Sequence, residues 1–202
     1  MVLSEGAFMK QIHIILVCAL LVTISVTFSA GGASAQHQHS EQAETHSTQP
    51  ALVTPSSIAE EHKHLHHQLD EALASGGETA VRARAVADVL LPHFKAEEEY
   101  AMPPLGLLQA IANDQPLTSE QRSEAIQMAR KLRGHYEQML QEHQQIHSAL
   151  EALASAARQE HKPKAAAFAE TLMLHAQNEE QVLYPTTLLI GKYLEHQSAA
   201  GQ

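Results

Sequence analysis

The chain has 202 residues, which is enough for one domain with a buried core and too few for two domains of ordinary size. Its formal net charge is −10 and its basic residues form no stripe, so nucleic acid is not expected as a partner. The single cysteine lies in an N-terminal apolar run, and a mature chain without that run would hold metal only through nitrogen and oxygen.

The N-terminus has the parts of a secretory signal peptide. An apolar run at 12–28 follows Lys10 and leads to the small residues Ala33-Ser34-Ala35. A basic residue, an apolar stretch and an Ala-x-Ala site predict cleavage after residue 35 and a periplasmic or secreted mature protein. The alternative is an uncleaved membrane anchor, because about 17 apolar residues are close to the minimum for a span. After cleavage, no contact with a membrane is expected.

Residues 36–54 are predicted to be a disordered linker. Three histidines, His37, His39 and His46, stand there among Ser, Thr, Gln and Glu, and up to Pro50 no apolar residue is larger than alanine. Such a composition cannot bury enough apolar surface to fold. We interpret the three histidines as part of a solvated tether, with weak metal binding as the alternative. The folded domain is expected at 55–197.

The first two helices are predicted from their ends and their apolar periodicity. The capping-box pattern at 57–60 begins the first helix, and Gly76-Gly77 ends it. The second helix follows and ends before Pro103-Pro104, with a kink at Pro92, because proline removes one helical hydrogen bond. A short apolar helix is expected at 105–112.

Two further long helices are predicted in the second half of the domain. The capping box at 118–121 opens the third helix, which is the longest. Pro163 opens the fourth helix and Pro185 closes it, with Val182 facing inward. A short tail helix is expected at 188–194. No stretch alternates as a strand does, so the fold is predicted to be all-α.

The two halves of the domain repeat one pattern. Glu61-His62 aligns with Glu142-His143 at an offset of 81 residues, and 93–103 aligns with 175–185 at an offset of 82. A duplicated helix hairpin can close into a pseudo-symmetric four-helix bundle. Residues of both halves would then meet on the pseudo-axis.

A metal site is predicted from the steps His93-x-x-x-Glu97 and His175-x-x-x-Glu179. A step of four residues places imidazole and carboxylate on one face of a helix. Burying such a pair twice is costly unless a cation neutralises the carboxylates. Donors without sulfur suit iron, zinc or manganese. The candidate ligands are His62, His93, Glu97, His143, His175 and Glu179.

Two glutamates and two tyrosines follow the ligand glutamates closely in the sequence. Glu98 and Glu180 follow the two ligand glutamates directly, and they either hydrogen-bond to the ligands or belong to a solvated face. Tyr100 and Tyr184 are interpreted as packing residues rather than as redox groups.

The motifs resemble the hemerythrin-like, or HHE cation-binding, family. The resemblance covers 56–190 and includes both His-x-x-x-Glu steps and both upstream Glu-His segments in the family's order. The matching segments are Glu61-His62, 93–98, Glu142-His143 and 175–185. The resemblance implies an antiparallel up-down four-helix bundle, with short extra helices after helices two and four.

The same resemblance implies a non-haem di-iron centre, bridged by Glu97 and Glu179 and completed by histidines. His147, one turn after His143, matches a His-x-x-x-His pattern of oxygen-carrying hemerythrins, and His66 is its counterpart in the first half. Both are either further ligands or hydrogen-bond partners of ligand carboxylates. This chain departs from the oxygen-carrying members at one position. Their last carboxylate is an aspartate five residues after the histidine of the fourth helix, whereas Glu179 follows His175 by four. The pattern is therefore more similar to the wider family, which includes iron–sulfur repair proteins and iron sensors.

The expected function is that of an exported di-iron protein that binds a small ligand, such as dioxygen or nitric oxide, or iron itself. The alternative is a di-iron peroxidase or oxidase that detoxifies small oxidants. A third possibility is a bundle with a single metal ion or with structural zinc.

Overall fold

The computed structural model describes residues 52–200. The predicted signal peptide and the three linker histidines lie outside these residues. Within 52–200 every regular element is helical and no strand occurs, which confirms the all-α prediction. None of the helices in this range combines the length and the hydropathy needed to cross a bilayer.

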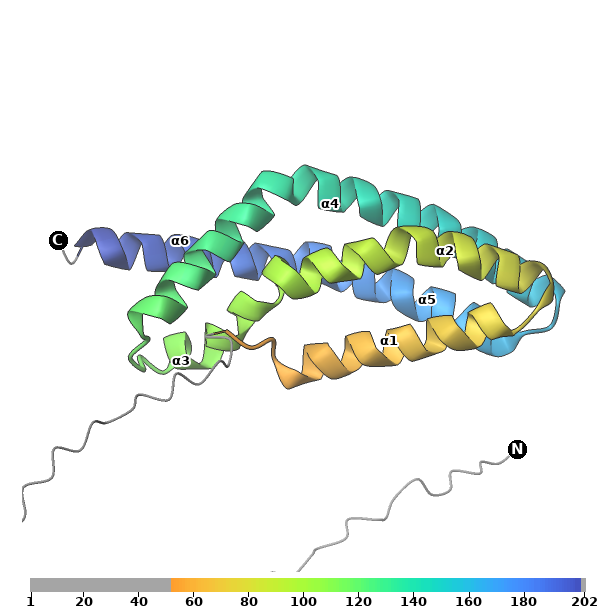
Figure 1. The fold of residues 1–202 in the computed structure, drawn as a ribbon, viewed down its shortest axis with the longest axis horizontal. Helices are drawn as coiled ribbons and strands as arrows, with labels where there is room; N and C mark the ends of the chain where they lie inside the picture. Colours follow the sequence, from red (N-terminus) through yellow and green to blue (C-terminus); the bar gives the residue numbers. More distant parts are fainter. Residues whose placement is uncertain (1–51, 201–202) are drawn as a thin grey trace, which may run out of the picture. The chain divides into compact units, whose positions relative to one another are not determined.

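Four long helices form two hairpins, the first from α1 (Ser56–Ala74) and α2 (Gly77–Ala96), the second from α4 (Ser119–Gln159) and α5 (Pro163–Asn178). The connections between the helices of each hairpin are short, and both lie at the same end of the molecule (Figure 1). Helix α1 contacts α2 and α5, and α4 contacts the same two helices, so the four helices close into a ring. The chain is a four-helix bundle.

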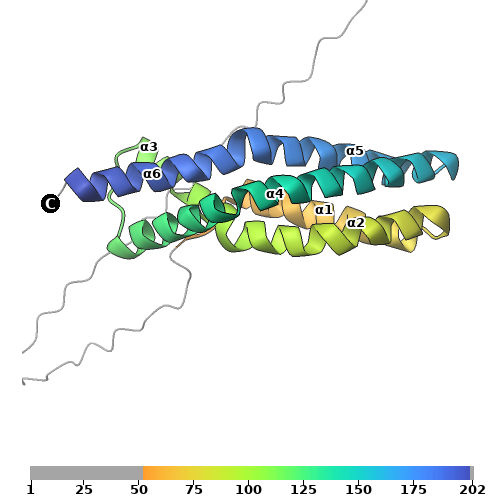
Figure 2. The ribbon, with the colours of Figure 1, turned by 90° about the horizontal axis from the view of Figure 1, so that it is seen from above.

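The bundle continues beyond the hairpins at the opposite end. Helix α6 (Tyr184–Ala200) extends the line of α5, and the first part of α4 packs beside it (Figure 2). Gly191 makes this close approach possible, because an added Cβ there would lie 2.3 Å from the Cβ of Ala129. The short elements η2 (Pro103–Leu107) and α3 (Leu108–Ala112) connect the two hairpins and include the predicted helix at 105–112.

One of the two predicted capping boxes is present. The Thr118 side chain accepts a hydrogen bond from the Gln121 amide at 3.1 Å, and the Gln121 side chain accepts one from the Thr118 amide at 3.0 Å. The capping box predicted at 57–60 was wrong, since α1 begins at Ser56 and no side chain caps it. Pro55 precedes the helix and its carbonyl already accepts the first amides, so the helix starts before Ser57 can act as a cap.

The first hairpin is tied to the second where their turns meet. Both carboxylate oxygens of Glu160 accept hydrogen bonds at the start of α2, from the Glu78 amide at 2.7 Å and from the amide and hydroxyl of Thr79 at 3.0 and 2.6 Å. Lys162 donates to Glu160 and to the Gly76 carbonyl. Hydrogen bonds from Lys162 and Thr79 lower the pKa of Glu160 to about 2. A residue of the second hairpin therefore caps a helix of the first.

Two short π-helical turns occur at equivalent places in the two hairpins: η1 (Glu97–Ala101) after α2 and η3 (Glu179–Leu183) after α5. In each, the glutamate carbonyl accepts a hydrogen bond from the amide five residues later. A π turn inserts one residue and rotates the chain that follows. Two predictions at or directly after η3 were wrong.

The first concerns Val182, which was expected to face inward and is 50% exposed. The second concerns Pro185, which was expected to close the helix. It lies instead at the second position of α6, where a residue without an amide hydrogen is tolerated. The predicted tail helix at 188–194 is part of this longer helix.

Candidate metal centre

The six residues predicted as ligands lie in one buried polar layer. Each exposes no more than 4% of its surface. The layer separates an apolar cluster on the side of the hairpin turns from a second apolar cluster around α6. Along α4, for example, Met139 belongs to one cluster, Ile146 to the other, and His143 stands between them. The layer takes side chains from α1, α2, α4 and α5 and from the two π turns.

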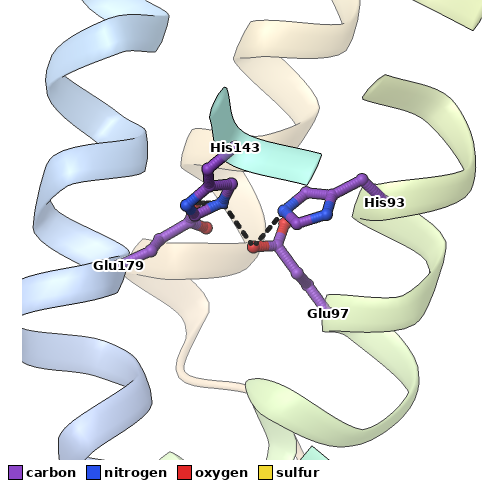
Figure 3. Close-up of side chains that lie close together, drawn as sticks. All are labelled: His93, Glu97, His143 and Glu179. Carbon is purple, nitrogen blue, oxygen red and sulfur yellow. Dashed lines mark ion pairs between the residues drawn. The ribbon is translucent and has the colours of Figure 1, made fainter. Parts of the chain in front are cut away.

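The donor atoms of this layer form two groups. The His93 group consists of His93, Glu97, His143 and Glu179, whose donor atoms all lie within 4.8 Å of one another (Figure 3). The His62 group consists of His62, His175 and Glu179, within the same limit. Each group combines residues from both halves of the repeat. Within 52–200, neither half of the repeat forms a group by itself, and Glu179 belongs to both groups.

The two oxygens of Glu179 face different groups. Its Oε2 lies 3.5 Å from Nε2 of His143, whereas its Oε1 lies 3.4 Å from Nε2 of His62 and 2.9 Å from Nε2 of His175. This is the placement of a bridging carboxylate. Glu97 lies 3.2 Å from His93 and 3.8 Å from His143, so within the described residues its ion pairs are with the His93 group.

Several donor atoms of the layer are buried without a hydrogen bond. They include Nε2 of His62, Nε2 of His175, Oε1 of Glu179 and Oε2 of Glu97. The short distance between His175 and Glu179 does not have hydrogen-bond geometry. Each unsatisfied buried polar atom costs about 1–3 kcal/mol. A cation coordinated by these atoms would remove that cost, so the residues present fit a metal ion.

Each histidine of the layer has a second carboxylate on its outer nitrogen, Nδ1. Three of these nitrogens, those of His93, His143 and His62, form a hydrogen bond with a glutamate side chain. The fourth, Nδ1 of His175, lies near the carboxylate of Glu61 but without the geometry of a hydrogen bond. The four distances are 2.7 Å for His93–Glu142, 2.9 Å for His143–Glu180, 3.1 Å for His175–Glu61 and 3.4 Å for His62–Glu98.

These outer carboxylates explain the Glu-His and Glu-Glu pairs of the sequence. A carboxylate on Nδ1 holds the proton there and leaves the lone pair on Nε2 for a metal. For Glu98 and Glu180, the sequence left open a hydrogen bond to a ligand or a solvated position. In the structure Glu98 contacts His62 and Glu180 contacts His143. Glu61 and Glu142 had no role assigned from the sequence. Their only signal was that each directly precedes a ligand histidine, yet each contacts a histidine of another helix.

The charges of the layer shift the pKa values of its groups. Burial alone would lower the pKa of His143, but the Glu179 and Glu97 carboxylates beside it raise this pKa to about 10. For His175, burial is likewise outweighed, chiefly by Glu179, and its pKa rises to about 9. Burial would raise the pKa of Glu179, but the adjacent His143, His175 and His62 hold it well below its usual range. The carboxylates thus attract positive charge, which protons or a metal can supply.

Tyr184 is part of the layer, although the sequence indicated only a packing role. Its buried hydroxyl donates a hydrogen bond to Oε1 of Glu97 and lies 3.3 Å from Nε2 of His93 and 3.2 Å from Nε2 of His143. Burial and the nearby carboxylates raise the pKa of Tyr184 well above its usual value. Tyr100, by contrast, donates to Sδ of Met139 at 3.3 Å and contributes to packing.

The two groups differ in their apolar surroundings. Phe94 stacks on His62, with ring centroids 4.6 Å apart, and covers that side of the His62 group. The residue equivalent to Phe94 in the second half of the repeat is Ala176. Ala176, His143 and Glu180 line a cavity of about 360 Å³ between α4 and α5. A small side chain therefore stands beside His143 where an aromatic ring covers His62.

The two further candidates, His66 and His147, lie outside both groups. The His66 ring packs against Phe94, with centroids 5.1 Å apart. The His147 side chain is 49% exposed, and its Nδ1 lies 3.8 Å from Glu151. Within the part of the chain that the structure describes, neither histidine belongs to a group of donor atoms.

No curated protein and no solved structure matches the chain. A family model does match: that of the hemerythrin HHE cation-binding domain, over residues 55–187. The matched range covers more than half of the chain and contains the whole polar layer. The chain belongs to the hemerythrin HHE cation-binding domain family.

Proposed function

We propose that this protein is an exported hemerythrin-like di-iron protein that binds a small ligand, such as dioxygen or nitric oxide, or iron itself. The observation that carries the proposal is the position of Glu179 between two groups of buried donors. One carboxylate facing two sets of imidazoles is an arrangement for two metal ions rather than one. Family membership and the unsatisfied buried donor atoms support the same conclusion.

The residues divide into holding and positioning roles. His62, His175 and Glu179 would hold one ion, and His93, His143, Glu97 and Glu179 the other. When bound, iron would supply redox chemistry and coordination positions for a small ligand. The outer carboxylates fix the imidazole orientations. The apolar clusters on both sides exclude water, which strengthens every charge interaction in the layer.

The cavity beside His143 adjoins one of the two donor groups. It reaches the polar layer between α4 and α5, and its lining ends on His143 and Glu180. A larger hollow of about 590 Å³ lies near Lys162 and Pro163 and includes no residue of either donor group. The first cavity is therefore the proposed approach to the site.

Metal analysis tests the proposal directly. The chain is expressed with iron supplied, and its metal content is measured together with its visible spectrum under air and under nitric oxide. We expect about two iron ions per chain and a spectrum that responds to the gases. Glu179→Ala should lose this iron, whereas Glu151→Ala, at an exposed site, should keep it. About one zinc ion and no iron per chain would contradict the di-iron proposal.

The same preparation separates ligand binding from catalysis. A binding protein should return to its starting spectrum when the gas is removed, without consuming an added reductant. Steady consumption of reductant in the presence of oxygen or peroxide would instead establish the oxidase or peroxidase alternative.

The proposal also includes the antiparallel up-down arrangement of the family and export through cleavage after residue 35. The ring of helix contacts and the two short hairpin turns support the first. The basic, apolar and small-residue segments of 1–35 support the second. The mass of the protein recovered from a secreting host tests export, because a mature chain beginning at Gln36 is expected. Recovery of the intact chain in membranes would favour the anchor.

A further inference from the structure

We infer that the phenol oxygen of Tyr184 is an additional ligand of the metal ion in the His93 group. The inference rests on the proposed metal site and goes beyond it, because Tyr184 belongs to neither His-x-x-x-Glu step nor to a Glu-His segment. It follows from the spacing of the donor atoms, from the orientation of the two imidazoles, and from a difference between the two halves of the repeat.

The donor spacing is that of one coordination sphere. The Tyr184 oxygen lies 3.2 Å from Nε2 of His143 and 3.3 Å from Nε2 of His93, and it contacts Oε1 of Glu97. The distance from His93 Nε2 to Glu97 Oε1 is 3.2 Å. Ligands held at bonds of about 2.1 Å lie roughly 3.0–3.4 Å from one another. Tyr184 is thus spaced from the two imidazole nitrogens as a donor that shares an ion with them, while its contact with Glu97 is a hydrogen bond.

The two imidazoles present the right nitrogen to the phenol. The outer nitrogens of His93 and His143 contact Glu142 and Glu180, so both rings turn Nε2 toward the Tyr184 oxygen. The Tyr184 hydroxyl donates to Glu97, so all four donor atoms converge on one another. A cation among the four atoms would take the place of the protons that link them.

The repeat supplies no second phenol. The residue equivalent to Tyr184 in the first half is Met102, at an offset of 82. Both residues directly follow a π turn and both are fully buried. Only one of the two donor groups can therefore gain an oxygen ligand from this position, which makes the two metal ions chemically unequal.

Coordination changes the phenol in a defined way. The O–H bond breaks, the proton leaves to solvent water, and the oxygen lone pair forms the bond to the ion. No electron is transferred, so no oxidant or reductant is required. A phenolate bound to ferric iron absorbs visible light by charge transfer from the ring to the metal, and a hydrogen-bonded phenol does not.

Resonance Raman spectroscopy of the ferric protein tests the inference. The full chain is loaded with iron, oxidised in air, and excited within its visible absorption. We expect ring vibrations of a bound tyrosinate that shift when ring-deuterated tyrosine is incorporated. Tyr184→Phe should lose them while retaining the helical circular dichroism of the wild type. Tyr100→Phe, which also removes a buried hydroxyl, should keep them.

A second variant tests the inference if Tyr184→Phe does not fold. The chain has four tyrosines, and replacing Tyr100, Tyr136 and Tyr193 together by phenylalanine leaves Tyr184 alone. Ring vibrations in that variant would support the inference. Uptake of two irons without tyrosinate vibrations in the wild type would overturn it and leave the di-iron proposal intact. Vibrations that persist in folded Tyr184→Phe would also overturn it. Failure to bind iron at all would overturn both.

Discussion

Replacing the outer carboxylates by glutamine should weaken metal binding in a graded series. The distance from the carboxylate to the histidine Nδ1 is 2.7 Å for Glu142, 2.9 Å for Glu180, 3.1 Å for Glu61 and 3.4 Å for Glu98. The exposed fractions of these side chains rise in the same order, 28, 38, 47 and 53%. Shorter and less hydrated charge-assisted contacts are stronger. The loss should be greatest at Glu142 and smallest at Glu98.

The expected size of the effect follows from the role of such partners. Losing a carboxylate that orients a ligand histidine costs about 10–100-fold in metal affinity, or roughly 1.4–2.7 kcal/mol. Glu142→Gln should lie near the upper end of this range, with Glu180→Gln and Glu61→Gln below it. Glu98→Gln should lose less than roughly fivefold, because a half-exposed pair contributes about 0–1 kcal/mol.

The measurement is an anaerobic competition for ferrous iron between the protein and a chromophoric chelator. Glu151→Gln is the matched control, since Glu151 is a glutamate of α4 beside the exposed His147. Circular dichroism checks that each variant keeps its helices. Equal losses at all four positions, or a larger loss at Glu98 than at Glu142, would refute the idea that contact geometry sets the contribution of each carboxylate.

Three other predictions concern the shared carboxylate of Glu179, the hydrogen bonds of Glu160 at the hairpin turns, and two glycines of the helices. Glu179→Gln should lose both metal equivalents, whereas Glu97→Gln should retain one, and equal stoichiometry in the two variants would argue against a shared Glu179. Glu160→Gln should lower the melting temperature at neutral pH. Because the folded pKa of about 2 lies below the ordinary 4.5, the difference from wild type is full above pH 4.5 and should disappear as the pH falls to 2. Gly191→Ala should destabilise the fold, since its Cβ would clash with α4. Gly134→Ala has open space and should stabilise the exposed helix by about 0.5–1 kcal/mol. Thermal denaturation with the same sign for both glycine variants would contradict this pair.

Much of the polar layer was predictable because helical spacing is a local property. The four-residue steps placed His93 with Glu97 and His175 with Glu179, and the repeat indicated that the two halves would meet. The fold class followed from the absence of strand patterns and from the helix-ending glycines and prolines. The capping box at Thr118 was also predictable, because its hydrogen bonds join residues three positions apart.

The remaining features depend on tertiary structure. A π turn differs from an α turn by one hydrogen-bond register, and no residue type marks it in 179–183. Without it, Tyr184 could not be placed beside Glu97. The partners of Glu61 and Glu142 lie on other helices, so sequence proximity to His62 and His143 did not identify them. The grouping of donors across the two halves likewise required the ring of helix contacts.

The two π turns also indicate how the repeat evolved. A π turn is a single-residue insertion in a helix, and this chain has one at the ligand glutamate of each half. One insertion copied along with its hairpin is a simpler history than two separate insertions at the same place. On that history, the ancestor was a single hairpin, and two copies paired about a twofold axis would have enclosed the same layer of histidines. On the same history, this layer began as an interface between two chains, and gene fusion placed it inside one.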